Sequence, residues 1–428
     1  MARALPPAVP ALALRFSASA RATRLPGMTP RVVVTGAGVI SPLGAGIDAF
    51  ADALWNGASS IQPSTRFPGT VASEFAEFNP TPWLGNKGVR VLDRGTRFLC
   101  VAAQMALSAT GLLQDAAGEG DADLGLVCGT LFGGVHSIAA FDWSGLTEGP
   151  ALVSPMEFPN TVINAPAGQA AIKHKLRGVN STICAGLSSG LYAIQHAAEF
   201  LRFGRAKYLM AGGMEEVCDE ASLGFRKLNL ASPTGRVKPF GTERDGTAAG
   251  EGSALWMMET EETAKSRGAT PLVEILGFGA AHDAREIMGY HVRGEGATEA
   301  ITQALEETGI GSDDIGCIVA GANGSRAGDA MEAHALRNVF GDRLAKIPVS
   351  APKAATGEAM GASGAFCALT AGLALERQQV PPTTGFTCTD SGLRLSADAQ
   401  PFSGEYALVN AFSCDGNNAA LVIRLWKN

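Results

Sequence analysis

The sequence of 428 residues lacks the features that mark several classes of protein. No uncharged apolar run approaches the roughly 18 residues of a membrane-spanning helix. The net charge is -7, so a nucleic-acid partner is not expected, because phosphate binding requires a basic face. The eight cysteines form no C-x-x-C pair, and the six histidines show no H-E-x-x-H or paired-ligand spacing. We therefore expect no disulfide framework, no metal site and a reducing, cytoplasmic location.

Acidic residues are also missing from the start of the chain, where the first is Asp48. Residues 1–28 instead carry several Ala and Ser and four arginines, which are Arg3, Arg15, Arg21 and Arg24. This composition is typical of an organelle transit peptide, and an upstream start codon ahead of Met28 would also produce such a segment. We expect residues 1–28 to be an N-terminal extension of the folded protein, either disordered or targeting-like.

Hydrophobic residues make up 46% of the chain, which is enough for a large core, and they recur in alternating strand and helix patterns. Apolar residues at three- and four-residue spacing before Gly204, for example, predict a helix. The alternation restarts near Pro271, so we expect two similar α/β halves, 29–270 and 271–428, with largely buried sheets. Residues 135–160 are predicted to interrupt the first half as an irregular insertion that contains aromatic residues.

The stretch RVVVTGAGVISPLG predicts a buried strand followed by a glycine turn. Gly36 and Gly38 match the first two glycines of the dinucleotide fingerprint G-x-G-x-x-G, but Ser41 stands in the third place. A partial match of this kind is weak evidence, and we expect no dinucleotide cofactor.

A second stretch, STICAGLSSG, offers three candidate nucleophiles, which are Cys184, Ser188 and Ser189. Cys184 precedes the turn on the predicted strand, where a free thiol usually packs as a small buried apolar group. The two serines fall in the first turn of the following helix, where hydroxyls commonly cap N–H groups. No histidine is placed to act as a base, so these residues favour a structural role for all three.

Seven motifs in order resemble the β-ketoacyl-acyl carrier protein synthases of the thiolase fold. They are VVVTGAGVISPLG, LRG, AGGMEE, KPFGTERDGTAAGEGSA, AGDAMEAHAL, PKAATGEAMGASGA and NAFSCDGNNAAL. The resemblance covers nearly the whole chain from Arg31 to Arg424. It implies two similar halves stacked as αβαβα, with a dimer formed across the sheets. It also implies a Claisen condensation, in which a thiolate carries the acyl chain and two histidines stabilise the enolate.

By this resemblance, the catalytic positions hold residues without the required chemistry. The nucleophile position, three residues before Gly190, is Leu187, and the first histidine position is Gly321. The second histidine is replaced by Glu358, whereas Lys353 of the same motif is retained. We expect Glu358 and Lys353 to form a buried ion pair, which leaves neither charge uncompensated. The alternative is that Glu358 acts as a base.

The resemblance also predicts which residues gate and line an acyl tunnel. The family's gate loop corresponds to residues 413–416, with Cys414 at the gate position. In resembling chain-length factors the tunnel residues follow a Gly-Gly turn, which is 133–134 here. The matching positions downstream are Val135, Ile138 and Asp142, with Phe141 in place of Asp142 if the register shifts by one. Phe132, just before the turn, is also expected at the tunnel or gate, and the alternative is that Val135 and Ile138 are simply core residues.

A ketosynthase-like chain that keeps the scaffold motifs but has other residues at the catalytic positions is similar to the chain-length factor. This factor is the ketosynthase β-subunit of type II polyketide systems. This implies a heterodimer with a catalytic ketosynthase and a growing chain carried on the phosphopantetheine of an acyl carrier protein, with no other cofactor. Leu187 can neither donate nor accept a hydrogen bond, so no decarboxylase role of its own is expected. A second hypothesis is an independent acyltransferase with a relocated nucleophile, Cys184 or Ser189.

Overall fold

The computed structural model describes residues 30–113, 118–285, 287–389 and 391–427, so the extension predicted over residues 1–28 lies outside the described residues. Its framework is a sheet of eleven strands in the order β12-β11-β15-β16-β10-β1-β9-β7-β5-β6, with β2 paired to β1. In chain order these strands are β1 (Val32–Ser41), β2 (Gly44–Ala45), β5 (Leu124–Gly129), β6 (Asn180–Ile183), β7 (Tyr208–Glu215), β9 (Gly252–Thr260), β10 (Val273–His282), β11 (Ile315–Val319), β12 (Val349–Ser350), β15 (Tyr406–Phe412) and β16 (Asn417–Leu425). Two small sheets pair β3 (Ile61–Pro63), β4 (Val71–Ser73) and β8 (Ala249–Gly250), and β13 (Gln379–Val380) with β14 (Gln400–Pro401).

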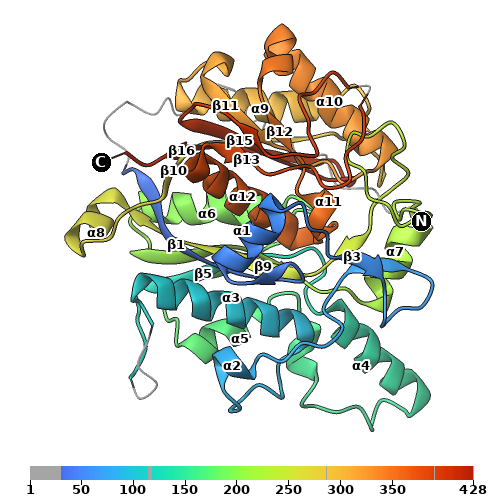
Figure 1. Ribbon diagram of the computed structural model, residues 1–428. Coiled ribbons are helices and arrows are strands. Elements are labelled where there is room, and N and C mark those ends of the chain that lie inside the picture. Colours follow the sequence, from blue (N-terminus) through green and yellow to red (C-terminus); the bar gives the residue numbers. More distant parts are fainter. Residues whose placement is uncertain (1–29, 114–117, 286, 390, 428) are drawn as a thin grey trace, which may run out of the picture.

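The helices divide the molecule into five layers, which confirms the predicted αβαβα arrangement (Figure 1). The helices are α1 (Ile47–Trp55), α2 (Thr81–Leu84), α3 (Arg94–Thr110), α4 (Val135–Thr147), α5 (Ala165–His174), α6 (Ser189–Arg202), α7 (Asp219–Lys227), α8 (Glu261–Ser266), α9 (Glu295–Thr308), α10 (Arg326–Phe340), α11 (Lys353–Thr356) and α12 (Ser363–Arg377). Helices α3 and α5 cover one outer face, and α9 and α10 cover the other. Helices α6 and α12 lie between the N-terminal and C-terminal strands, and their apolar residues pack with strand residues of both halves in the largest core cluster.

Both halves are built on one plan. Strands β5, β6 and β7 are parallel, whereas β9 and β1 continue the sheet antiparallel. The second half repeats this pattern with β11, β12 and β15, followed by β16 and β10. Strands β1 and β10 pair with each other, with Val32 opposite Ile275, and this pairing joins the halves. No helix among the described residues is long and apolar enough to span a membrane.

The glycines of the partial dinucleotide motif have a packing role in this fold. A Cβ atom on Gly38 of β1 would overlap the carbonyl oxygen of Ala102 in α3. In the second half, a Cβ atom on Gly279 of β10 would overlap the carbonyl oxygen of Ala300 in α9 in the same way. The glycines therefore let an outer helix pack directly on a strand backbone.

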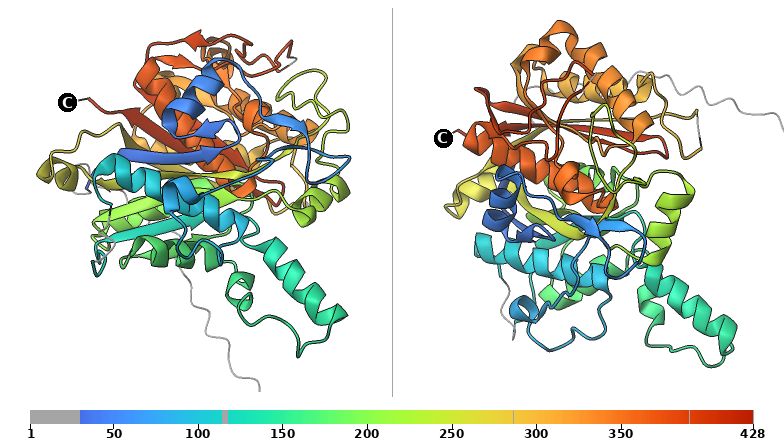
Figure 2. Two further views of the ribbon diagram at one scale, coloured as in Figure 1. Left: turned by 60° about the horizontal axis from the view of Figure 1, so that its bottom comes forward. Right: turned by 45° about the vertical axis from the view of Figure 1, so that its right-hand side comes forward.

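The prediction of an irregular insertion over residues 135–160 is wrong for the first half of that segment. Residues Val135–Thr147 form α4, and a 3-10 turn follows at Phe158–Thr161. Together with the loop between them they project from the body as an arm (Figure 2). None of the residues of α4 is fully buried, so the helix has no core-facing stripe. Its sequence therefore carries no strong helical periodicity.

The two helices of the middle layer cross with their first turns in backbone contact. A Cβ atom on Gly190 of α6 would lie 2.8 Å from the carbonyl oxygen of Gly361 and 2.9 Å from the amide nitrogen of Ala365. Only glycine fits at so close an approach. Leu187 lies two residues before the start of α6, and Glu358 precedes the 3-10 turn Met360–Ala362 that leads into α12. The crossing therefore brings the two segments that precede the helices together.

We expect Gly190→Ala to destabilise the protein by about 1–3 kcal/mol, because the added methyl group must push α6 and α12 apart. Gly372→Ala in α12 is the matched control, since the nearest atoms to its added Cβ, on Trp256 and Val273, would be 3.8 Å away. The control should leave stability unchanged or raise it slightly, because alanine favours a helix over glycine. Chemical denaturation of both variants tests this; equal stabilities would contradict the crossing.

Candidate functional site

Leu187 lies in the turn between β6 and the first turn of α6, where it is only 4% exposed. Its side chain joins an apolar cluster of buried residues, which are Cys218, Ala221, Phe225 and Met360. Its backbone N–H donates to Ser413 Oγ at 3.0 Å. A helix N-terminus favours negative charge, yet the side chain placed here is an alkyl group that cannot carry charge.

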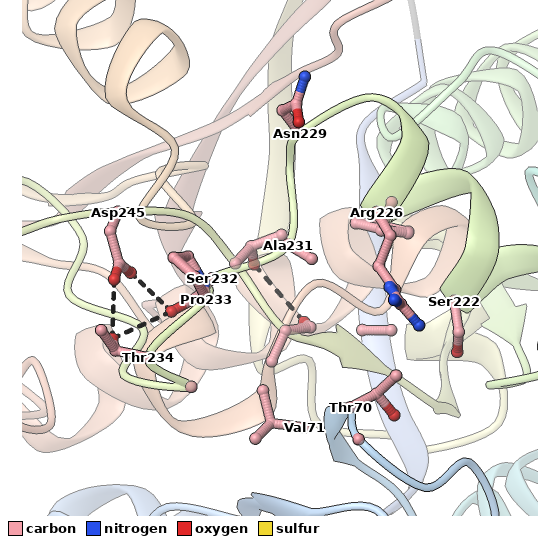
Figure 3. A pocket seen from close by; sticks show the side chains of 16 residues that line it. Thr70, Val71, Ser222, Arg226, Asn229, Ala231, Ser232, Pro233, Thr234 and Asp245 are labelled. Atoms are coloured by element: carbon pink, nitrogen blue, oxygen red, sulfur yellow. Dashed lines mark hydrogen bonds between the residues drawn. The ribbon is translucent and has the colours of Figure 1, made fainter.

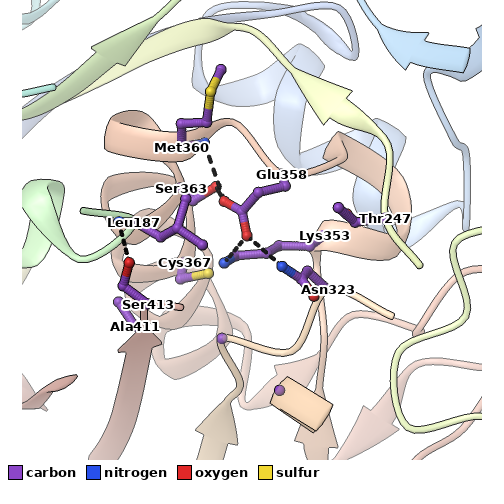
Figure 4. Close-up of polar contacts among 12 residues, drawn as sticks. Leu187, Thr247, Asn323, Lys353, Glu358, Met360, Ser363, Cys367, Ala411 and Ser413 are labelled. Carbon is purple, nitrogen blue, oxygen red and sulfur yellow. Dashed lines mark hydrogen bonds and ion pairs between the residues drawn. The ribbon is translucent and has the colours of Figure 1, made fainter. Parts of the chain in front are cut away.

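Glu358 and Lys353 form the predicted ion pair, with Lys353 Nζ 2.7 Å from Glu358 Oε2 (Figure 4). Glu358 is fully buried, and its carboxylate also accepts hydrogen bonds from Asn323 Nδ2 at 2.9 Å, the Met360 N–H at 3.1 Å and Ser363 Oγ at 2.5 Å. Burial opposes the charge on Lys353, but the Glu358 carboxylate outweighs this effect and raises the Lys353 pKa. Four donors therefore occupy Glu358, which argues against its action as a base.

Gly321 faces the same region from the end of β11, and no side chain fits there without movement. Its N–H donates to Glu332 Oε1 at 3.0 Å. A Cβ atom on Gly321 would lie 2.9 Å from the carbonyl oxygen of Asn410 on β15. A histidine at this position would require strand β15 to shift.

Ser188 and Ser189 are both buried and both bound to backbone groups. Ser188 Oγ lies 2.8 Å from the carbonyl oxygen of Ala411. Ser189 Oγ lies 2.6 Å from the carbonyl oxygen of Gly186 and accepts the Ala185 N–H at 2.9 Å. The contacts are structural, but the predicted capping is wrong: Ser188 makes no side-chain cap bond, and its hydroxyl donates to the carbonyl oxygens of Ala411 and Asn417.

The prediction that Cys184 is buried is wrong for the isolated chain, in which this residue is exposed. It follows β6, the last strand of the sheet, so no further strand covers it. Partial burial of the thiol, and then the nearby Glu215 carboxylate, raise the pKa of Cys184. A raised pKa leaves less of the thiolate that nucleophilic attack requires.

The residues predicted to form a gate and tunnel are only partly gathered around Leu187. Phe132 and Val135 pack against the Leu187 cluster. Phe141 instead contacts Phe158 within the arm, at 5.9 Å between ring centroids. Three further residues do not belong to the cluster. Ile138 is half-buried on α4 and Asp142 is exposed, whereas Cys414 is buried in the core of the C-terminal half. Burial, and then Asp415, raise the pKa of Cys414 to about 11.

A cavity of about 530 Å³ that sequence reasoning did not predict opens beside the Leu187 cluster (Figure 3). Phe225 and Ala231 belong to both the cavity wall and the cluster. The opposite rim is polar, because Asp245 accepts hydrogen bonds from Ser232 at 2.6 Å and from Thr234 at 2.8 Å. No sequence signal marks the cavity, because its lining residues come from separate segments. Within the described residues, no group of three or more His, Cys, Asp or Glu side chains is arranged to hold a metal ion.

A two-half αβαβα fold with two central helices that begin at one buried site defines the thiolase-like class of condensing proteins. Comparison with known families agrees. The model "Beta-ketoacyl synthase, N-terminal domain" matches residues 29–264, and "Beta-ketoacyl synthase, C-terminal domain" matches residues 272–387. This chain belongs to the β-ketoacyl synthase family.

The curated relatives include the 3-oxoacyl-[acyl-carrier-protein] synthase 2 of Coxiella burnetii, which is 33% identical over 92% of this chain and 98% of that protein. The enzyme of the same name from Rhizobium meliloti is 31% identical over the same shares. Among solved structures, the ishigamide ketosynthase/chain length factor has a TM-score of 0.86 and 28% identity, covering 93% of this chain and 100% of that one. A β-ketoacyl synthase from Burkholderia phymatum has a TM-score of 0.86, 27% identity and the same coverage.

We expect Lys353→Met to destabilise the protein by about 3–5 kcal/mol, because it leaves the buried Glu358 charge without its cation. The double variant Lys353→Met/Glu358→Gln should lose less, since no uncompensated charge remains. Denaturant unfolding of both single variants and the double variant measures the coupling. Additive losses would contradict an energetically coupled pair.

Proposed function

We propose that this chain is a catalytically silent ketosynthase-like subunit, a chain-length factor, that pairs with an active ketosynthase and shapes the tunnel for the growing chain. One observation carries the proposal: the carboxylate at the second histidine position is paired with Lys353 and bound by three further donors. A condensing site needs groups that are free to bind the enolate or carbonyl oxygen, and Glu358 has no such freedom.

The rest of the site supports the same proposal. Leu187 supplies no nucleophile, and its N–H, which lies at a helix start where an oxyanion could bind, already donates to Ser413 Oγ. Gly321 supplies no side chain, and the backbone of Asn410 closes the space beside it. The three positions therefore lack the nucleophile and both hydrogen-bond donors that condensation requires.

A surface suited to a partner subunit lies at the open end of the sheet. The opposite end is covered, because Val349 of β12 donates its N–H to the carbonyl oxygen of Arg394. Strand β6 ends the sheet at the other side. The arm carries large exposed apolar side chains, including Leu146 at 81% and Met156 at 72% exposure. Apolar patches of this kind favour association.

Solved structures that are similar to this chain support a complex with a ketosynthase. One title names the ishigamide ketosynthase/chain length factor, and another names a type II PKS acyl-carrier protein in complex with its ketosynthase. For the present chain we infer a heterodimer in which the partner supplies the nucleophile. An acyl carrier protein with a phosphopantetheine-bound chain would deliver the substrate to that partner.

We expect the isolated chain to show no condensation of acyl and malonyl carrier proteins, because it lacks the three catalytic groups. Leu187→Cys alone should also fail, since each missing oxyanion donor normally contributes about 3 kcal/mol to catalysis. Product analysis by mass spectrometry tests both chains. Intact-mass detection of an acyl adduct that Cys184→Ser or Ser189→Ala abolishes would favour the independent acyltransferase instead.

We expect Leu146→Asp to weaken binding to the ketosynthase partner by tenfold or more, because it places a charge on the apolar arm; tenfold corresponds to about 1.4 kcal/mol. Ile287→Asp is the matched control, since Ile287 is 99% exposed on the C-terminal half. Co-expression followed by size exclusion and titration measures the effect. A stable chain whose behaviour the partner does not alter would count against the heterodimer.

We expect Val135→Phe to shift products of the reconstituted pair toward shorter chains and Ile138→Ala to shift them toward longer chains. Each additional methylene group of the growing chain that the tunnel can bury contributes about 0.8 kcal/mol of favourable free energy. Asp142→Asn on the exposed side of α4 should leave the distribution unchanged. Identical product lengths for all variants, with the pair intact, would remove these residues from the tunnel.

A further inference from the structure

Glu215 is a fully buried carboxylate at the end of β7 that none of the steps above uses. It accepts hydrogen bonds from Thr130 Oγ1 at 3.0 Å, the Leu131 N–H at 2.6 Å and the Phe132 N–H at 3.3 Å. It also accepts the Gly361 N–H at 3.1 Å. One side chain therefore binds three consecutive residues of one loop and one residue of a distant loop.

The two loops belong to different halves of the molecule. Residues 130–132 follow β5 and lead into α4, whereas Gly361 lies in the 3-10 turn Met360–Ala362 that leads into α12. Phe132 from the first loop and Met360 from the second both pack in the cluster that surrounds Leu187. The Glu215 carboxylate therefore fixes the spacing between two walls of that cluster.

The contacts depend on the charge state of Glu215. Burial raises the pKa of Glu215 to about 7, although the N–H donors oppose the shift. Other titratable groups that act on it or respond to it are Cys128 on β5, Cys184 beyond β6 and the adjacent Glu216. Burial, and then Asp93, raise the pKa of Glu216 to about 8. An ionised Glu215 offers only acceptors to its four donors, whereas a protonated one presents an O–H to them.

We propose that Glu215 is a positioning residue that sets the width of the acyl tunnel by holding Phe132 and Met360 at a fixed separation. This inference rests on the proposed function of the chain as a tunnel-shaping subunit. It names a specificity determinant that does not line the tunnel itself. Loss of the carboxylate charge releases the 130–132 loop from the 360–362 turn, and the space around Leu187 widens.

The experiment compares two neighbouring buried carboxylates in the reconstituted pair. Glu215→Gln has nearly the same shape but puts an NH2 group against backbone N–H donors. Glu216→Gln is the matched control, because Glu216 accepts the Gly95 N–H of α3 and does not touch either loop. We expect Glu215→Gln to shift products toward longer chains at every pH, while Glu216→Gln retains the wild-type distribution.

A pH series separates this role from a general structural one. Below about pH 7 the wild-type pair should shift toward the longer products of Glu215→Gln, because protonation mimics the amide. The ratio of wild-type to Glu215→Gln products, measured with the same partner, removes the pH response of the ketosynthase. Hydrogen exchange at residues 130–134 and 359–362 should accelerate roughly tenfold or more in Glu215→Gln, as expected for lost bonds to a charged acceptor.

Different results contradict the proposed function and the role of Glu215. A wild-type pair that forms no product contradicts the proposed function. A productive wild-type pair with unchanged product lengths in Glu215→Gln, or with unchanged exchange in both segments, overturns the role of Glu215. If Glu215→Gln does not fold, Thr130→Val removes the hydroxyl that donates to Glu215 and accepts the Gly133 N–H, and it leaves the three backbone donors to Glu215 in place. This variant should give a smaller shift in the same direction, and no shift in it overturns the role equally.

Discussion

The close crossing of α6 and α12 is the contact on which the site depends. Gly190 lets the first turn of α6 lie against Gly361 and Ala365, so the starts of two buried helices converge between the two groups of strands. Unpaired N–H groups and the positive ends of both helix dipoles therefore meet in one small volume. A buried region with this field favours an anion. In this chain the anions are two glutamates, Glu358 and Glu215, which bind the amides of residues 360 and 361.

The contacts around Glu358 stabilise its buried carboxylate. Lys353 forms an ion pair with the Glu358 carboxylate, and Asn323 and Ser363 donate hydrogen bonds to it. Beside it, Leu187 fills the nucleophile position with apolar volume. A buried ion pair is weak evidence for net stability, because desolvation offsets much of the attraction. Its effect here is to hold Lys353 and Glu358 in one arrangement beside Leu187.

The two halves share their strand plan but differ at their outer ends. The C-terminal half closes its edge with the segment around Arg394, whereas the N-terminal half ends in β6 and carries the arm built on α4. The residue that follows β6, Cys184, is exposed for the same reason. An uncovered strand edge beside exposed apolar side chains is a natural surface for another subunit.

The sequence alone determined the layered α/β fold, the two halves and the ends of the core helices. The helix predicted before Gly204 is α6, which ends at Arg202. These features are set by local hydrophobic periodicity and by glycines at fixed spacing, which act over a few residues. Motif order likewise predicts that Leu187, Gly321 and Glu358 stand at the family's catalytic positions, and this assignment stays a prediction.

Tertiary structure alone decided the rest. Nothing local in the sequence of Val135–Thr147 predicts α4 strongly, because the helix buries no complete face. The exposure of Cys184 depends on β6 being the last strand, and strand order is a property of the whole sheet. The role of Glu215 depends on bonds to residues 83 to 146 positions away in sequence. Contacts over such separations leave no local periodicity, so only the folded chain reveals which buried carboxylate joins the two halves.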